Sequence, residues 1–164
     1  AIGELLKLNG LTSPDGLADK FFEAFYEPVA RQLSIFADSV SVLAELKKWG
    51  KKIGLISNTL LPAEYHLREM KNYGLLEHFD FTIFSSSFGW RKPHPAIFNQ
   101  ALEKIALPAE KTLYVGDRYI EDYMGPTLVG MKAIIKYRAG REYPRPWPPE
   151  ITVVKSLSEI LLLL

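Results

Sequence analysis

The stretch Leu113-Tyr114-Val115-Gly116-Asp117-Arg118-Tyr119-Ile120-Glu121-Asp122 decides the fold of this chain. It starts as an apolar strand, and Asp117 stands where the apolar run stops. Asp117 and Asp122 then lie five residues apart across a junction between a strand and a helix. Two such carboxylates can share one hard cation, since Mg²⁺ takes one or two carboxylates together with water and substrate oxygens. The simpler interpretation is that Asp117 or Glu121 only caps the following helix.

Short apolar strands alternate with helices on both sides of this stretch, from Asp38 onward. The alternation predicts an α/β fold, in which βαβ units build a parallel sheet with right-handed crossovers. Strands are expected at 52–57, 81–84, 112–116, 132–136 and 151–154. Helices are expected before Gly50, at 62–73, 95–105 and 121–129, and after a capping Ser156, with the Pro-rich segment 138–149 as a loop.

Residues 1–37 have a different pattern, so the chain divides into this segment and a core domain over 38–164. An aromatic stripe marks one face of a helix in the first segment, formed by Phe21, Phe22, Phe25 and Val29. A stripe with this spacing indicates a core or docking face rather than a ligand site. Pro28 is expected to kink this helix or to start a new one.

Two further polar segments are candidate site residues in addition to Asp117 and Asp122. Ser57-Asn58 ends a predicted strand, and its hydroxyl, amide and backbone N–H groups can hold a phosphate oxygen, although such a pair is usually just a turn. Lys92 can neutralise a phosphate or a carboxylate cluster, and its proline neighbours argue against an ordinary surface lysine. Ligands of parallel sheets bind beyond the carboxyl ends of the strands, where Ser57, Lys92 and Asp117 are expected to meet.

Composition excludes several classes of protein. The net charge of +1 and the scattered Lys and Arg give no reason to expect nucleic acid. The absence of cysteine excludes disulfides and thiolate metal sites. The longest apolar run, Ile160 to Leu164, is far short of the roughly 20 residues of a membrane span, so a soluble, cytoplasmic protein without a membrane partner is expected.

In order and spacing, these signals resemble the second, third and fourth motifs of the haloacid dehalogenase superfamily, in its phosphatase-like branch. The resemblance implies a three-layer Rossmann-like parallel sheet, with 1–37 as the rear half of a small helical cap. By similarity, Ser57 and Asn58 hold the transferring phosphoryl group of a small phosphorylated metabolite, and Lys92 screens its charge. Asp117 binds Mg²⁺ directly, and Asp122 assists through water or by orienting Lys92.

The chain departs from the family in one respect. The family nucleophile lies in an Asp-x-Asp motif after the first strand, and no Asp-x-Asp occurs among the 164 residues. Residues 1–164 are therefore expected to be inactive alone, either as a fragment of a phosphatase that works through an aspartyl-phosphate or as a protein that lost catalysis. A dehalogenase-like hydrolase acting on carbon is a further alternative, and the metal pair argues against it. Because the absent strand lies mid-sheet in this family, a missing N-terminal segment or another chain is expected to complete the sheet.

Overall fold

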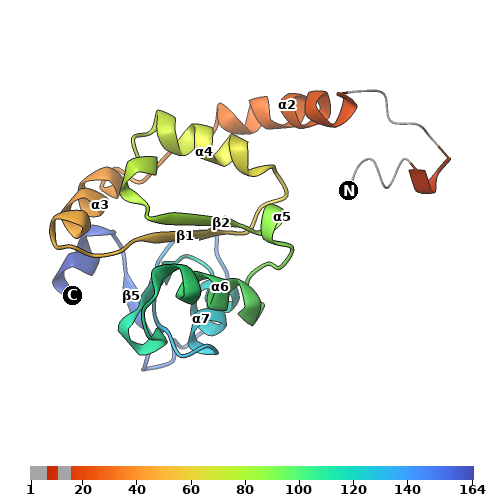
Figure 1. Cartoon of the computed structure of the whole chain (residues 1–164). Coiled ribbons are helices and arrows are strands. Elements are labelled where there is room, and N and C mark those ends of the chain that lie inside the picture. Colours follow the sequence, from red (N-terminus) through yellow and green to blue (C-terminus); the bar gives the residue numbers. More distant parts are fainter. Residues whose placement is uncertain (1–6, 11–15) are drawn as a thin grey trace. The chain divides into compact units, whose positions relative to one another are not determined.

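The computed structural model describes residues 7–10 and 16–164. The chain divides into two compact units, with the boundary in the sequence between Ser34 and Ile35. Residues 1–6 and 11–15 of the predicted cap segment lie outside the described part. In the first unit, helix α2 (Leu17–Ala30) continues through Pro28, so the proline does not start a new helix (Figure 1). Phe21 and Phe25 of the aromatic stripe stack on each other and remain about half exposed.

Two parallel sheets form the second unit, which confirms the predicted α/β class. The first sheet pairs β1 (Gly54–Ser57) with β2 (Phe81–Phe84), and Ser57 lies beside Phe84. The second has the order β3 (Leu113–Gly116), β4 (Lys132–Lys136) and β5 (Thr152–Val154). Within the described residues, β1 and β3 each pair with one strand only. Each of these two strands therefore has one unpaired edge.

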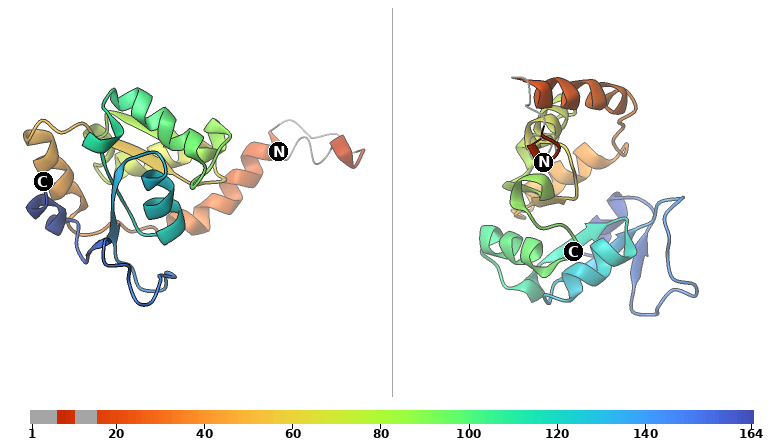
Figure 2. Two further views of the ribbon diagram at one scale, coloured as in Figure 1. Left: turned by 90° about the horizontal axis from the view of Figure 1, so that it is seen from below. Right: turned by 90° about the vertical axis from the view of Figure 1, so that its right-hand side faces the viewer.

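Helices pack around the strands. The first four α-helices of this unit are α3 (Ser39–Lys48), α4 (Ala63–Asn72), α5 (Ser85–Phe88) and α6 (Pro95–Ile105). In Figure 1, α4 lies above the β1–β2 pair and α6 below it. Two further views show α6 beside α7 (Gly125–Thr127) (Figure 2). Helices thus cover both faces of the first sheet, as expected for βαβ units.

The main core lies where α6 meets the strands. Ile97, Phe98 and Ala101 are buried at spacings of one and three, so they form one helix face. They pack with Ile83 of β2 and with Met131, which directly precedes β4. Pro95 occupies the first turn of α6, where its missing N–H costs nothing. The buried face fixes the start of this helix, and therefore the segment just before it that carries Lys92.

The region after β3 differs from the prediction. A regular helix was expected at 121–129, whereas the structure has a π-helix, Tyr119–Met124, followed by the short helix α7. Pro126 lacks the N–H that a continuing helical ladder needs, which favours a change of geometry at this point. The closing helix is a 3-10 helix, Ser158–Leu162, and β1 begins at Gly54 rather than at residue 52. The remaining short turns are 3-10 helices at Leu76–His78 and Ala109–Lys111.

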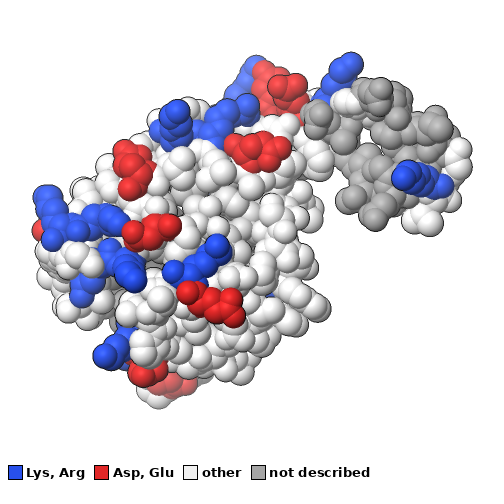
Figure 3. Space-filling view, viewed as in Figure 1, with Lys and Arg blue, Asp and Glu red and all other residues white. Residues whose placement is uncertain are grey.

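The described surface has two plain properties. Acidic and basic side chains are interspersed over the face shown in Figure 3, and neither sign of charge dominates there. Among the described helices, none combines the length and the apolar character that crossing a membrane requires.

Candidate active site

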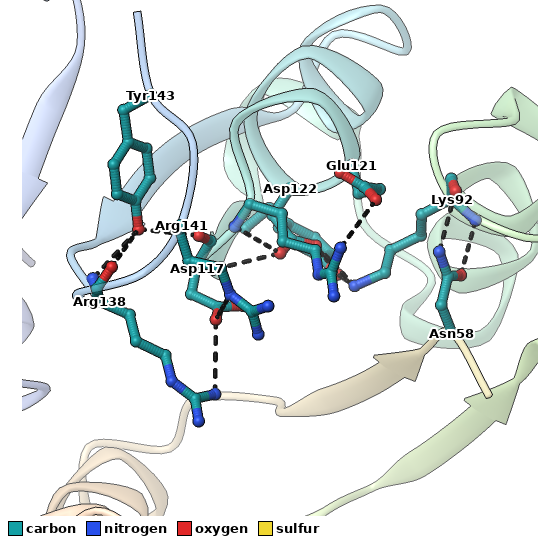
Figure 4. A network of polar contacts seen from close by, with 10 residues as sticks. Asn58, Lys92, Asp117, Glu121, Asp122, Arg138, Arg141 and Tyr143 are labelled. Atoms are coloured by element: carbon teal, nitrogen blue, oxygen red, sulfur yellow. Dashed lines mark hydrogen bonds and ion pairs between the residues drawn. The ribbon is translucent and has the colours of Figure 1, made fainter.

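Asn58, the residue after β1, fixes the backbone of Lys92. Its Nδ2 donates to the Lys92 carbonyl oxygen at 2.9 Å, and its Oδ1 accepts from the Lys92 N–H at 2.8 Å (Figure 4). The amide therefore uses both of its polar atoms to join two segments 34 residues apart. Because both bonds are to backbone atoms, they set the direction in which the Lys92 side chain leaves the chain.

The Lys92 ammonium is buried in a polar cluster at the end of β3. Its Nζ lies 2.5 Å from Oδ1 of Asp122 and 2.9 Å from the hydroxyl of Tyr114. The side chain of Lys92 is 10% exposed and that of Asp122 only 4%, so water screens this ion pair weakly. An ammonium has three N–H donors, and these two contacts use two of them. The third N–H has no hydrogen-bond partner among the residues that the structure describes.

Asp122 is saturated with hydrogen bonds. Oδ1 accepts from Lys92 and, at 3.4 Å, from Tyr114, while Oδ2 accepts from the backbone N–H groups of Asp117 and Arg118 at 3.1 and 3.0 Å. Backbone N–H groups at the start of a helix have no partner within the helix, so this carboxylate satisfies two of them. Asp122 thus ties the turn after β3 to Lys92.

Tyr114 completes this cluster as a neutral donor. Burial raises the pKa of Tyr114 well above its ordinary value, and the negative charge of Asp122 raises it further. The phenol therefore keeps its proton, which it donates to Asp122 while it accepts a hydrogen bond from Lys92. Tyr114 was not predicted as a site residue, because it lies on an apolar strand and its hydroxyl acquires a role only through its neighbours in the fold.

Asp117 faces a different set of partners. Its Oδ2 accepts from Nε of Arg141 at 2.7 Å and lies 3.6 Å from Nη1 of Arg138. Tyr143 donates its hydroxyl to the Asp117 carbonyl oxygen at 2.9 Å. The side chain is 25% exposed, and its Oδ1 has no hydrogen-bond partner among the described residues. One carboxylate oxygen is therefore held by arginine, and the other is open.

These arginines were not predicted as site residues. The one signal in the sequence was a local excess of basic residues in and before the Pro-rich loop, formed by Lys136, Arg138, Arg141 and Arg145. The pattern gives no partner for these charges, because the contact with Asp117 spans 24 residues and depends on how the loop folds back.

Ser57 stands at the end of β1, next to Asn58, and is half-buried. Its hydroxyl makes no hydrogen bond to any described residue, so it is not joined to the polar network directly. The next turn is fixed instead by Thr59, whose N–H and carbonyl oxygen both bond to the hydroxyl of Ser85 at 2.9 and 3.0 Å. The shallow pocket between α4, β2 and α6 includes none of the predicted site residues.

The arrangement offers limited ligands for a metal ion. Over residues 7–10 and 16–164, no group of three or more acidic or histidine side chains is placed to hold one. Asp117 presents the open carboxylate oxygen, a hard donor of the kind that Mg²⁺ prefers. Asp122 would have to release the ammonium or a backbone N–H before it could bind a cation.

Several known proteins have sequences similar to this chain. The sequence profile of haloacid dehalogenase-like hydrolases matches residues 5–136. A haloacid dehalogenase-like hydrolase domain-containing protein 3 from Danio rerio is 35% identical over 89% of this chain and 58% of its own length. A glyceraldehyde 3-phosphate phosphatase from Methanothermobacter thermautotrophicus is 29% identical over 76% of this chain and 56% of its own.

Solved structures of haloacid dehalogenase-like proteins are similar to this chain in fold. A 2-haloacid dehalogenase from Pseudomonas syringae has a TM-score of 0.74 and 28% identity, covering 90% of this chain and 60% of its own. The chain thus spans about half the length of the curated relatives that it matches. The profile match covers most of the chain, and the strands are parallel as the resemblance implied, although they form two sheets where one was expected. The chain belongs to the haloacid dehalogenase-like hydrolase family.

Proposed function

We propose that the protein is an Mg²⁺-dependent phosphatase of small phosphorylated metabolites. The observation that carries the proposal is the buried Lys92 ammonium, which contacts Asp122 and Tyr114 and has a third N–H without a partner among the described residues. Asp122 also accepts from the backbone N–H of Asp117, so it connects Lys92 to the residue with the open carboxylate oxygen. A positive donor beside a metal-binding carboxylate suits a phosphate ester, whose oxygens need both. The similarity to a glyceraldehyde 3-phosphate phosphatase supports this substrate class.

Each residue then has a role that its contacts allow. Lys92 gives its third N–H to the phosphoryl group and neutralises the charge that develops on it. The Ser57 hydroxyl and the backbone N–H of Asn58, neither of which has a partner among the described residues, bind phosphoryl oxygens. The Asn58 amide acts indirectly, because both of its polar atoms hold Lys92.

Asp117 is the residue that would hold Mg²⁺, through Oδ1. When bound, the ion supplies positive charge to the phosphoryl oxygens. Asp122 was predicted as a second metal residue, and we propose that it contributes chiefly by holding Lys92 in place. Two hydrogen bonds to backbone N–H groups and one buried ion pair would otherwise be lost.

The chemical step needs an aspartate nucleophile, and the sequence has no Asp-x-Asp motif to supply it. By the family resemblance, such an aspartate attacks phosphorus to form an aspartyl-phosphate, and the bond to the ester oxygen breaks. A second aspartate protonates the leaving oxygen and then takes a proton from the water that hydrolyses the intermediate. We infer that a strand carrying these aspartates, from a segment upstream of residue 1 or from another chain, pairs with the edges of β1 and β3 that are unpaired among the described residues.

The experiment compares substrate classes with the protein expressed from its full gene. We expect hydrolysis of p-nitrophenyl phosphate with Mg²⁺ and none after EDTA treatment. Chloride release from 2-chloropropionate that persists in EDTA would instead favour a hydrolase acting on carbon. Absence of both activities, with a first strand that lacks aspartate, would favour a non-catalytic protein of this fold.

A further inference from the structure

The loop after β4 docks onto the residue that we propose as the metal ligand. Arg138 and Arg141 both direct their guanidinium groups at the same oxygen, Oδ2 of Asp117, as Figure 4 shows. The two side chains differ in burial, since Arg141 is 29% exposed and Arg138 is 56% exposed. Arg141, with the shorter distance and the lower exposure, makes the stronger contact.

The charges around Asp117 oppose a cation. Among the described residues, Asp117 and Asp122 form ion pairs with three cationic side chains, Lys92, Arg138 and Arg141, so the cations outnumber the two carboxylates. The neighbouring Arg118 is balanced by Glu121. A guanidinium stays charged at every accessible pH, so these charges cannot be removed by deprotonation. A cation at Asp117 therefore meets repulsion from Arg141, and an anion nearby meets attraction. A guanidinium also matches phosphate and carboxylate geometry in a bidentate way.

The loop has a second anchor that does not depend on this ion pair. Tyr143 donates to the backbone carbonyl of Asp117, and its hydroxyl accepts from the Arg138 N–H at 3.0 Å. Its ring packs against Tyr137 and Trp147, with centroid distances of 5.5 and 4.8 Å. The loop backbone therefore stays docked when the Arg141 side chain leaves Asp117.

We propose that the Arg141 guanidinium is shared between two alternative partners. It pairs with Asp117 in the absence of ligands, and it binds an anionic group of the substrate when a cation is bound. This inference rests on the proposed function. Without an anion, Arg141 weakens cation binding, because its guanidinium occupies Asp117. With the anion bound, Arg141 strengthens cation binding, because the anion removes the guanidinium from Asp117. Binding free energies are reciprocal, so cation and anion each raise the affinity for the other.

The test measures binding rather than turnover. Mn²⁺ replaces Mg²⁺, and its free concentration is followed by electron paramagnetic resonance with the protein expressed from its full gene. Arg141→Gln is compared with Arg145→Gln, which removes the same charge from the same loop at a residue that has no ion pair among the described residues. Thermal melting verifies that each variant is folded.

Without phosphate, Arg141→Gln is expected to bind Mn²⁺ on the order of three- to tenfold more tightly than the wild type. Arg145→Gln is expected to change the affinity less than twofold. Addition of inorganic phosphate should tighten Mn²⁺ binding to the wild type at least fivefold, and this gain should shrink by at least half in Arg141→Gln. Trp147, the fluorophore of the loop, should report little change on Mn²⁺ binding in a Trp49→Phe, Trp90→Phe background.

The outcomes separate the two proposals. Equal or weaker Mn²⁺ binding by Arg141→Gln, or an unchanged phosphate effect, would overturn the shared role of Arg141 and leave the phosphatase proposal standing. Absence of Mn²⁺ binding in every variant would overturn the metal site itself, and the role of Arg141 with it.

Discussion

Asp122→Asn tests how firmly the buried ion pair builds the site. The substitution keeps the size of the side chain and removes its charge. The Lys92 side chain, 10% exposed, then loses the one carboxylate that it pairs with among the described residues. The amide can accept through one oxygen, whereas the carboxylate accepts from Lys92, Tyr114 and two backbone N–H groups. The variant leaves a buried charge and at least one buried donor unsatisfied.

The magnitude follows from the burial of both partners. Removal of one partner of a buried ion pair costs about 3–5 kcal/mol of unfolding free energy. With a urea dependence of about 1–3 kcal/mol per molar, the unfolding midpoint should fall by roughly 1–5 M. Urea unfolding of the protein expressed from its full gene, followed by circular dichroism, measures this shift. Glu121→Gln is the matched control, because Glu121 pairs at 3.4 Å with Arg118, which is 50% exposed, and should cost less than about 1 kcal/mol.

A double-mutant cycle with Lys92→Met decides the cause. If the unpaired ammonium is what destabilises Asp122→Asn, removing it as well should recover about 1–3 kcal/mol relative to the sum of the single variants. Additive losses, or a loss below about 1 kcal/mol in Asp122→Asn, would refute the argument that these two groups form a coupled buried pair.

Three further predictions follow from particular contacts. Gly116→Ala should lose about 1–3 kcal/mol in urea unfolding, because a Cβ there would overlap the Asp122 side chain; a neutral effect would contradict this packing. Burial lowers the pKa of His66, so the unfolded chain binds its proton more readily, and the stability present above about pH 6.5 should be lost on acidification. His66→Gln should reduce that loss between pH 7.5 and 5, and equal slopes would refute it. Residues 1–164 alone should self-associate or unfold without cooperativity, because β1 and β3 have free edges, and a monomer with a sharp urea transition would contradict this.

The sequence predicted the strands where apolar runs stop at a polar residue or a glycine. The strands at 81–84 and 132–136 lie where they were expected, because each is a short buried run between helices. The π-helix at Tyr119–Met124 was missed, since the apolar spacing of so short a segment does not distinguish helix types. Asp117 and Asp122 were predicted as a pair, but their different surroundings follow from tertiary contacts.

The candidate site was predictable only in part, because tertiary contacts determine which side chains meet there. Lys92 and Asp122 were connected through the family resemblance, and the structure brings them to 2.5 Å. Arg141 and Tyr114 had no local signal, because an arginine in a loop and a tyrosine in a strand are ordinary residues until the fold gives them partners. Ser57 was predicted beside Lys92. Of the pair Ser57-Asn58, it is Asn58 that forms hydrogen bonds with the lysine among the described residues.

The central claim, that this network is the site of an Mg²⁺-dependent phosphatase, is tested most directly by one comparison of kcat. Asp117→Asn and Glu121→Gln are measured with p-nitrophenyl phosphate and Mg²⁺, each in the protein expressed from its full gene and verified as folded. The network predicts a loss of at least about 100-fold in kcat for Asp117→Asn, because the proposed metal ligand loses its charge, and less than a threefold change for Glu121→Gln. Full activity in Asp117→Asn, or activity that survives EDTA unchanged, would contradict the claim.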